Sequence, residues 1–226
     1  MRSVILIILF LFLHFSCYCQ LSAGDDSYLI GSSGTFNHSN GADNFYLEGN
    51  YFASKGEYQR ALNAYSEAIK RDSTFVEAYQ NRGYLKYVIQ DFQGAISDFD
   101  KMYTLNPYSY ASYELRGMAR FKLRDFRGAV DDYTKVIDSS MINDVYLYNK
   151  RGEANYYLGE YNGAIRDANR VIRVLGAGKN VKAVAYRFRG LAEVGLSNRT
   201  VGCLDLVKAK KLGDHLASDI EDMFCK

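Results

Sequence analysis

Histidines and cysteines are the side chains best suited to chemistry in this 226-residue chain, and both are scarce. Apart from His14 near the N-terminus, the histidines are His38 and His215, which lie too far apart to give the spacing of a metal site. Catalysis needs titratable groups that converge on one point. The sequence has neither a Gly-x-x-x-x-Gly-Lys-Ser/Thr phosphate loop nor a Gly-x-Ser-x-Gly elbow. It therefore predicts no active site, no metal and no cofactor.

A repeated pair of opposite charges is the most regular pattern among the charged residues. Four arginines are each followed sixteen residues later by an aspartate: Arg82 and Asp98, Arg116 and Asp132, Arg151 and Asp167, and Arg189 and Asp205. The arginines could form a ladder that binds a ligand, or each pair could be a structural salt bridge between two helices. We favour the salt bridge, because Glu48 and Ala64 stand 34 residues before the first pair and so replace both partners together.

Two cysteines near the C-terminus, Cys203 and Cys225, permit three different states. They could form a disulfide that joins the last two helical segments, remain buried free thiols, or act as a redox pair. No Cys-x-x-Cys motif and no partnering histidine accompany them. Redox chemistry therefore has the least support, and the other two states stay open.

An internal repeat of about 34 residues positions these side chains. Each unit has an aromatic residue, two further residues, an arginine (a glutamate in the first unit) and a glycine, and a small residue twelve positions later. The glycines and small residues are Gly49 and Ala61, Gly83 and Ala95, Gly117 and Ala129, Gly152 and Ala164, and Gly190 and Gly202. Apolar residues follow spacings of three and four in both halves, which predicts two antiparallel helices per unit.

This pattern resembles the tetratricopeptide repeat (TPR) family, whose 34-residue unit is a helix hairpin with small residues where the helices cross. The resemblance implies an all-α, right-handed superhelical solenoid of about five hairpins over residues 42–213. The expected units are 42–75, 76–109, 110–144, 145–182 and 183–213, and a capping helix is expected over 214–226 to cover the last core face. The family's usual aromatic residue three positions after the glycine is kept as Phe52 but replaced later by Lys86, Arg120, Asn155 and Glu193.

The N-terminal segment has the layout of a secretory signal peptide over residues 1–19. Its apolar run from Val4 to Phe15 is shorter than the ~20 residues that span a bilayer, and a polar stretch follows it. Residues 20–41 are rich in Gly, Ser, Asn and Asp and predict a flexible tether. We therefore expect a secreted or periplasmic protein. An uncleaved anchor is one alternative; lipoprotein anchoring at Cys17 or Cys19 is another, but the residues before them fit poorly.

The resemblance also implies a binding groove on the concave face, which the first helix of each unit lines. The family's ligand-facing positions lie three residues before the glycine and one, four and five after it. At these positions stand Tyr46, Asn50, Gln80, Tyr84, Tyr87, Glu114, Met118, Phe121, Asn149, Glu153, Tyr156, Tyr157 and Arg187. Tyrosine combines a rigid apolar ring with a hydroxyl, which suits recognition of a peptide or protein. Tyr87, Phe121 and Tyr156 fit the core equally well.

The numbers and positions of the charged residues argue against two kinds of ligand. With 28 basic and 26 acidic residues, the chain is not expected to bind nucleic acid. A TPR groove that binds the acidic tails of chaperones needs basic residues at the positions of Tyr46, Gln80, Glu114 and Asn149. We therefore do not expect this chain to bind such tails. We expect a non-enzymatic scaffold that binds a peptide or protein in the groove, with no stable membrane span after signal cleavage. The alternatives are a structural subunit of an envelope or surface complex that uses its convex face and cap, and a thiol-active or carbohydrate-handling protein.

Overall fold

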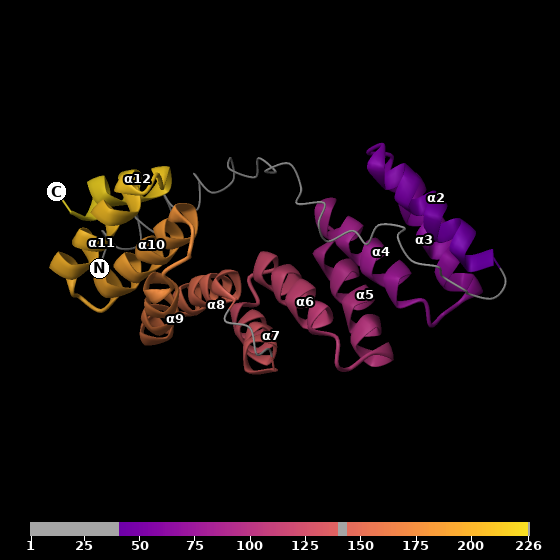
Figure 1. The fold of residues 1–226 in the computed structure, drawn as a ribbon, viewed down its shortest axis with the longest axis horizontal. Helices are drawn as coiled ribbons and strands as arrows, with labels where there is room; N and C mark the ends of the chain where they lie inside the picture. The colour runs from indigo at the N-terminus through magenta and orange to yellow at the C-terminus, as the bar shows by residue number, and fades with distance from the viewer. Residues whose placement is uncertain (1–40, 140–143, 226) are drawn as a thin grey trace, which may run out of the picture.

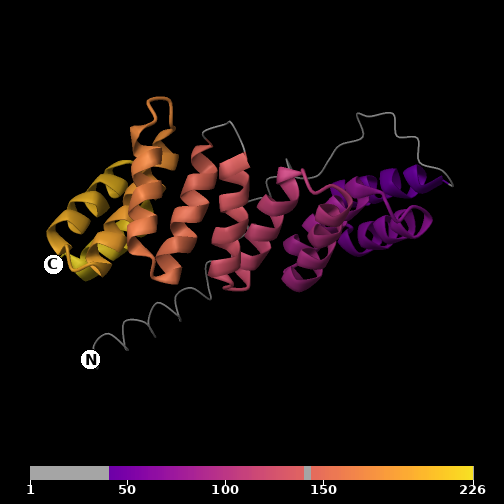
Figure 2. The same cartoon turned by 90° about the horizontal axis from the view of Figure 1, so that it is seen from below.

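The computed structural model describes residues 41–139 and 144–225. The predicted signal peptide and all but the last residue of the predicted tether lie outside these residues. The described residues form eleven helices and no strand, which confirms the all-α fold. The helices follow one another along an arch (Figure 1) and stand side by side in a row when the arch is seen from below (Figure 2).

Ten of these helices form five antiparallel hairpins, called here the first to fifth repeats, and the last helix packs on the fifth repeat. The helices are α2 (Ala42–Ser54), α3 (Tyr58–Arg71), α4 (Val76–Val88), α5 (Phe92–Leu105), α6 (Tyr110–Lys122), α7 (Phe126–Ser139), α8 (Val145–Leu158), α9 (Tyr161–Arg173), α10 (Lys179–Gly195), α11 (Arg199–Lys211) and α12 (His215–Phe224). Figure 1 shows α4, α6, α8 and α10 on the inner side of the arch. None of the described helices is both long enough and apolar enough to cross a membrane.

Each hairpin turn places one residue in the left-handed region, seven positions after the repeat glycine. Gly56 and Gly159 occupy this position in the first and fourth repeats, with φ values of 74° and 85°. Gln90, Arg124 and Ser197 take the same conformation, with φ values of 67°, 64° and 68°. A side chain is disfavoured in this region. The two glycines were therefore a sequence signal for the turn position, which the spacing analysis did not use.

The repeat glycines allow the two helices of a hairpin to approach closely. In the first three repeats, a Cβ on Gly49, Gly83 or Gly117 would lie 2.5, 2.7 or 2.9 Å from the ring of Tyr65, Phe99 or Tyr133, respectively. The glycine therefore makes room for an aromatic ring rather than for the small residue twelve positions later. The fourth repeat has Ala168 in place of that ring, and a Cβ on Gly152 would meet the Cβ of Asp167 at 3.3 Å.

The two helices of the fifth repeat make the closest backbone contact of the five hairpins. A Cβ on Gly190 would lie 2.8 Å from the main-chain oxygen of Gly202. Backbone cannot rotate away as a side chain can, so this crossing requires glycine on both helices.

The fifth repeat also begins earlier than expected. Its first helix, α10, starts at Lys179, four residues before the predicted boundary at 183. The extra turn is held in place because Asn149 Nδ2 donates to the main-chain oxygen of Val181 at 2.9 Å, and Val181 packs against the buried cluster of Ala168, Val171 and Ala185. These contacts give residues 179–182, which the predicted boundaries place in the fourth unit, a packing role in the fifth repeat.

The C-terminal helix α12 is fixed by three different contacts. Asp214 caps it by accepting a hydrogen bond from the main-chain nitrogen of Ala217, and Gly213 ends the preceding helix with a φ of 98°. The same Asp214 forms an ion pair with Arg187 of α10 at 2.7 Å. A disulfide bond joins Cys203 of α11 to Cys225. The cap is therefore tied to both helices of the fifth repeat.

The helix crossings at Gly152 and Gly190 predict different effects of an added methyl group on stability. We expect Gly190→Ala to lower the free energy of unfolding by about 1–3 kcal/mol, because the added methyl collides with backbone. Gly152→Ala should be close to neutral, because its neighbour is a side-chain atom at 3.3 Å and alanine gains up to about 1 kcal/mol of helix propensity. Urea denaturation of both variants measures the difference. Equal losses would contradict the backbone explanation.

Candidate binding groove

The four predicted Arg–Asp pairs are ion pairs inside the repeats. In each, the arginine donates to both carboxylate oxygens of the aspartate sixteen residues later, with Nη2–Oδ1 distances of 2.7, 2.6, 2.7 and 2.9 Å for Asp98, Asp132, Asp167 and Asp205. All four aspartates are buried. A buried carboxylate needs such charge-assisted hydrogen bonds. These arginines therefore join the two helices of a repeat and do not line a ligand site.

Each arginine also reaches the preceding repeat, which sequence reasoning missed. Its Nη1 donates to a polar side chain five positions after the small residue of that repeat. The partners are Ser66 for Arg82, Asp100 for Arg116, Thr134 for Arg151 and Asn169 for Arg189. The hydrogen bond with Asp132 raises the pKa of Arg116, although burial opposes this. One guanidinium thus links three helices from two repeats.

Lys86 and Arg120 stand three positions after the repeat glycine, where the family usually has an aromatic residue, and the structure gives a reason for both. Lys86 Nζ lies 2.9 Å from Asp98 Oδ2, and Arg120 Nη1 lies 2.8 Å from Asp132 Oδ2. These cations give the buried aspartates a second donor. The first repeat has no buried aspartate, and there the position keeps its aromatic residue, Phe52, which is buried. Between the first repeat and the next two, the arginine, the aspartate and the second donor therefore change together, whereas Glu193 of the fifth repeat supplies no donor to Asp205.

The inner positions of the first two repeats are filled by core side chains. Tyr46 is 0% exposed and Tyr84 is 5% exposed, so the prediction that they line the groove is wrong. The ring of Tyr46 packs on Phe75, at the start of the next repeat, with centroids 4.9 Å apart. Burial raises the pKa of Tyr46. Asn50 accepts hydrogen bonds from Tyr65 and from the fully buried Asn81, so it also belongs to this interior network.

Several other predicted groove residues make contacts within the protein. Asn149 is bonded to the backbone of Val181, and Arg187 is paired with Asp214. Met118 packs against the core of the first three repeats. Gln80 and Glu114 are half-buried and also have partners in the chain. The position three residues before the glycine therefore serves mainly in contacts within the solenoid.

A cluster of aromatic rings lies between the third and fifth repeats. The Tyr157 ring stacks on Phe126 at 5.2 Å and meets Phe121 and Phe188 edge-on at 5.8 and 6.3 Å. Tyr157 remains 39% exposed, and burial raises its pKa to about 12, so the hydroxyl stays protonated at neutral pH. This ring is the predicted groove aromatic that solvent reaches most.

Tyr87, Phe121 and Tyr156, which the sequence assigns equally well to the groove or to the core, are all half-buried. Phe121 meets Phe126 edge-on at 5.3 Å, and Tyr156 lies 5.8 Å from Phe188. Tyr87 packs against the core and stacks on Tyr84 at 6.2 Å. Their rings join neighbouring helices and leave one part open to solvent.

Charged side chains lie beside Tyr157. Glu153 is half-buried one helical turn before it on α8. Burial raises the pKa of Glu153, while the positive charges of Arg187, Lys150 and Lys122 oppose this. Among the described residues, Glu153 forms no hydrogen bond or ion pair. Keeping a partly buried carboxyl without a partner is unfavourable, which is typical of a binding site.

Lys150 is the second unpaired charge and was missed by sequence reasoning, because it stands two residues before the glycine. It is half-buried, and burial lowers its pKa, while Glu114 and Glu153 oppose the change. It has no hydrogen bond or ion pair with another described residue. We call Phe121, Lys150, Glu153 and Tyr157 the inner patch.

Comparison with known proteins agrees with this architecture. The sequence family described as TPR repeat matches residues 49–88, which run from the first repeat glycine to the end of α4. The chain carries tetratricopeptide repeats. No curated protein matches it significantly.

Solved structures with a similar fold include TPR proteins. YrrB, described as a TPR protein with an unusual peptide-binding site, gives a TM-score of 0.70 at 21% identity, with 80% of this chain and 92% of that chain covered. MamA from Desulfovibrio magneticus RS-1 gives 0.71 at 16% identity, with 78% and 97% covered. The first TPR of Spaghetti (RPAP3), bound to the HSP90 peptide SRMEEVD, gives 0.50 at 25% identity, with 54% and 98% covered. The first two likenesses show the fold.

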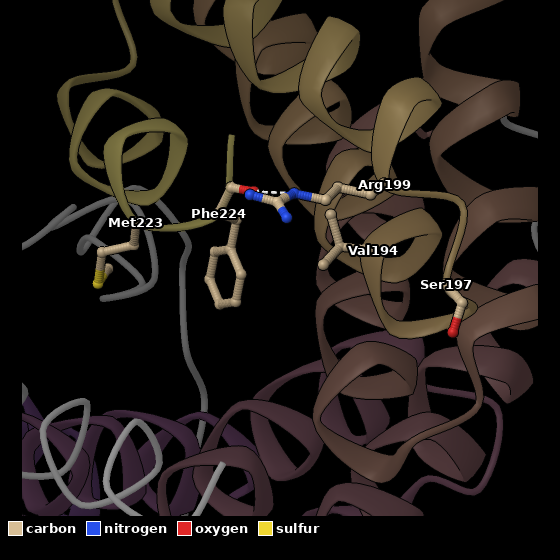
Figure 3. A pocket seen from close by; sticks show the side chains of 5 residues that line it. All are labelled: Val194, Ser197, Arg199, Met223 and Phe224. Carbon is tan, nitrogen blue, oxygen red and sulfur yellow. Dashed lines mark hydrogen bonds between the residues drawn. The ribbon is translucent and has the colours of Figure 1, made fainter. Parts of the chain in front are cut away.

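A cavity of about 370 Å³ lies at the C-terminal end, between the fifth repeat and α12 (Figure 3). Its lining residues are Val194, Ser197, Arg199, Met223 and Phe224. Arg199 Nε donates to the main-chain oxygen of Phe224 across one side (Figure 3). Arg199 is the one titratable side chain in this lining, so the cavity holds no acid–base pair. Among the described residues, no group of three or more potential metal ligands occurs either.

The buried ion pairs of the TPR repeats predict a large difference between two adjacent aspartates. Asp132→Ala should lower the free energy of unfolding by about 3 kcal/mol, because it removes the buried carboxylate that two half-buried guanidinium groups share. Asp131→Ala should change it by less than about 0.5 kcal/mol, because Asp131 is exposed. Urea denaturation tests the contrast. A small effect of Asp132→Ala would show that the ion pair is dispensable.

The inner patch predicts a stability that depends on pH. The raised pKa of Glu153 means that the folded protein keeps the proton at a pH where the unfolded chain has lost it, so this group lowers stability as the pH rises from about 4.5. Glu153→Gln should therefore be more stable than the unaltered protein at pH 7.

The gain should disappear below the ordinary glutamate pKa, where Glu153 is neutral in both states. Urea denaturation at pH 7 and at pH 3.5 gives both values, and Glu48→Gln, at an exposed glutamate, serves as the control. A gain of the same size at both values of pH would contradict the assignment to ionisation of Glu153.

Proposed function

We propose that this protein is a non-enzymatic interaction scaffold that binds a peptide or a segment of a partner protein at the inner patch. The observation that carries the proposal is the pair of half-buried charges Glu153 and Lys150, which form no hydrogen bond or ion pair with another described residue, beside the exposed ring of Tyr157. A ligand that supplies opposite charges to both would remove the unfavourable burial of each. The exposed ring offers the apolar contact area on which peptide recognition depends.

The position of the patch follows from the packing of the solenoid. In the first two repeats, Tyr46, Tyr84 and Asn81 are buried, Asn81 donates a hydrogen bond to Tyr46, and Tyr84 belongs to the same hydrophobic core as Tyr46. Around α8, by contrast, Tyr157 packs on neighbouring rings but stays 39% exposed, and Glu153 and Lys150 form no hydrogen bond or ion pair with another described residue. Similar proteins support a peptide ligand, because YrrB is described as having a peptide-binding site and RPAP3 was solved with an HSP90 peptide.

The proposal includes a secreted or periplasmic location, which rests on the signal-peptide pattern of residues 1–19. It assigns no cofactor and no nucleic-acid ligand. Thiol exchange is not part of it, because Cys203 and Cys225 form a disulfide that fastens the cap.

A structural subunit of an envelope or surface complex is the second candidate. It is favoured by apolar side chains at the C-terminal end that are about half exposed: Val201 and Leu204 on α11, and Leu216 and Met223 on α12. Such a subunit would use this end and the convex face instead of the inner patch.

Peptide selection on the purified chain separates these candidates. Peptides selected from a displayed random library should bind the unaltered protein and lose at least about tenfold in affinity, or about 1.4 kcal/mol, with the double variant Glu153→Gln/Tyr157→Ala. Tyr146→Ala, at a tyrosine 61% exposed elsewhere on α8, should leave affinity unchanged. The inner patch is the wrong site if the double variant binds the selected peptides as well as the unaltered protein.

A further inference from the structure

The buried aspartates of four repeats do not all have the same set of partners. Three of them have a second cation besides the arginine of their own repeat: Lys86 at Asp98, Arg120 at Asp132 and Lys208 at Asp205. Asp167 of the fourth repeat has Arg151 as its one cationic partner among the described residues. In place of the second cation it has the neutral amide of Asn155, at 3.3 Å.

Asn155 follows the path of the missing cation but ends earlier. In the third repeat, the Arg120 side chain passes over Gly128, where an added Cβ would lie 3.0 Å from Arg120 Cδ. In the fourth repeat, an added Cβ on Gly163 would lie 3.0 Å from Asn155 Cγ. The two side chains therefore leave their helices in the same direction, and the shorter one does not fill the space that an arginine fills.

A cavity of about 200 Å³ lies at this place. Its walls come from α7, through Val130 and Thr134, and from α8 and α9, through Asn155, Gly163 and Asp167. Arg151 and Arg166 complete the lining. Asp167 is 4% exposed and is the one acidic residue of the lining, and Val130 is its one large apolar residue.

We propose that this cavity binds a lysine or arginine side chain of a partner protein, with its charged end at Asp167 Oδ2. The same oxygen in two other repeats takes a cation from the chain itself, since Lys86 binds Asp98 Oδ2 and Arg120 binds Asp132 Oδ2. Val130 supplies apolar contact for the methylene groups of the bound side chain. The bound group takes the place of the long hydrogen bond from Asn155.

The charges around the cavity set the strength of this contact. Arg151 is neutralised by Asp167, and Arg166 is exposed at the wall without an ion-pair partner among the described residues. Its repulsion makes the binding of one isolated cation weak, in the millimolar range. A useful contact therefore needs the rest of the partner's surface.

This site is separate from the inner patch. Asn155 stands two residues from both Glu153 and Tyr157 on α8, and helix positions two apart point in nearly opposite directions. The proposal does not depend on the function proposed above, and either could fail alone.

Nuclear magnetic resonance tests the site with methylguanidinium as the probe and the full purified chain as the target. The amide signal of Gly163 and the side-chain amide of Asn155 should shift and saturate at millimolar probe. Neutral methylurea should produce no saturating shift. Asn155→Arg should fill the cavity and lower the affinity for methylguanidinium at least about tenfold. It should also raise the urea concentration at the midpoint of unfolding.

A reverse variant provides a positive control within the same chain. Arg120→Asn should open the equivalent space beside Asp132 and add a saturating shift at Gly128. The proposal is overturned if methylguanidinium gives no saturating shift at Gly163, or if the shift persists in Asn155→Arg. It is equally overturned if sulfate saturates these signals and methylguanidinium does not, because the two arginines would then define an anion site.

Discussion

A carboxylate buried between two helices is the interaction on which the second to fifth repeats depend. Its charge is costly inside the protein unless several donors satisfy it. The arginine one position before the repeat glycine supplies two of these donors, and its remaining nitrogen binds the preceding repeat. One buried ion pair therefore fixes both the hairpin and its stacking on the previous hairpin. The glycine beside it lets the two helices approach closely enough for this bond.

The fourth repeat is the least filled of the series. It has Ala168 where the first three repeats have an aromatic ring, and Asn155 where the second and third have a cation. Both proposed contact surfaces lie on its first helix, α8, with Glu153 and Tyr157 on one side and Asn155 on the other. The first repeats, by contrast, use their inner side chains for packing. The chain thus combines a closely packed N-terminal half with a region around α8 in which charged side chains lie beside partly exposed aromatic rings.

The helical hairpins and the Arg–Asp pairs could be predicted from sequence, because both depend on residue spacing that recurs four or five times. The second arm of each arginine could not, because its partners Ser66, Asp100, Thr134 and Asn169 share a position but not a residue type. Tyr46 was assigned to the groove because its position in the repeat does not show that a neighbouring side chain, Phe75, packs on its ring. Lys150 was missed because its position is not among the family's ligand-facing ones. The signal peptide remains a prediction from residues 1–19.

The most direct test of the central claim uses the solution that the first repeat already contains, in which Ala64 and Phe52 stand at the aspartate and second-donor positions. The measurement is the free energy of unfolding of Asp132→Ala alone and combined with Arg120→Phe. Arg116 keeps Asp100 as a partner in both variants. The second change removes a half-buried cation that has lost its buried carboxylate and keeps a 3.7 Å contact with the exposed Asp125, so the combined variant should recover most of the loss. Losses that simply add would contradict the dependence of these positions on one another.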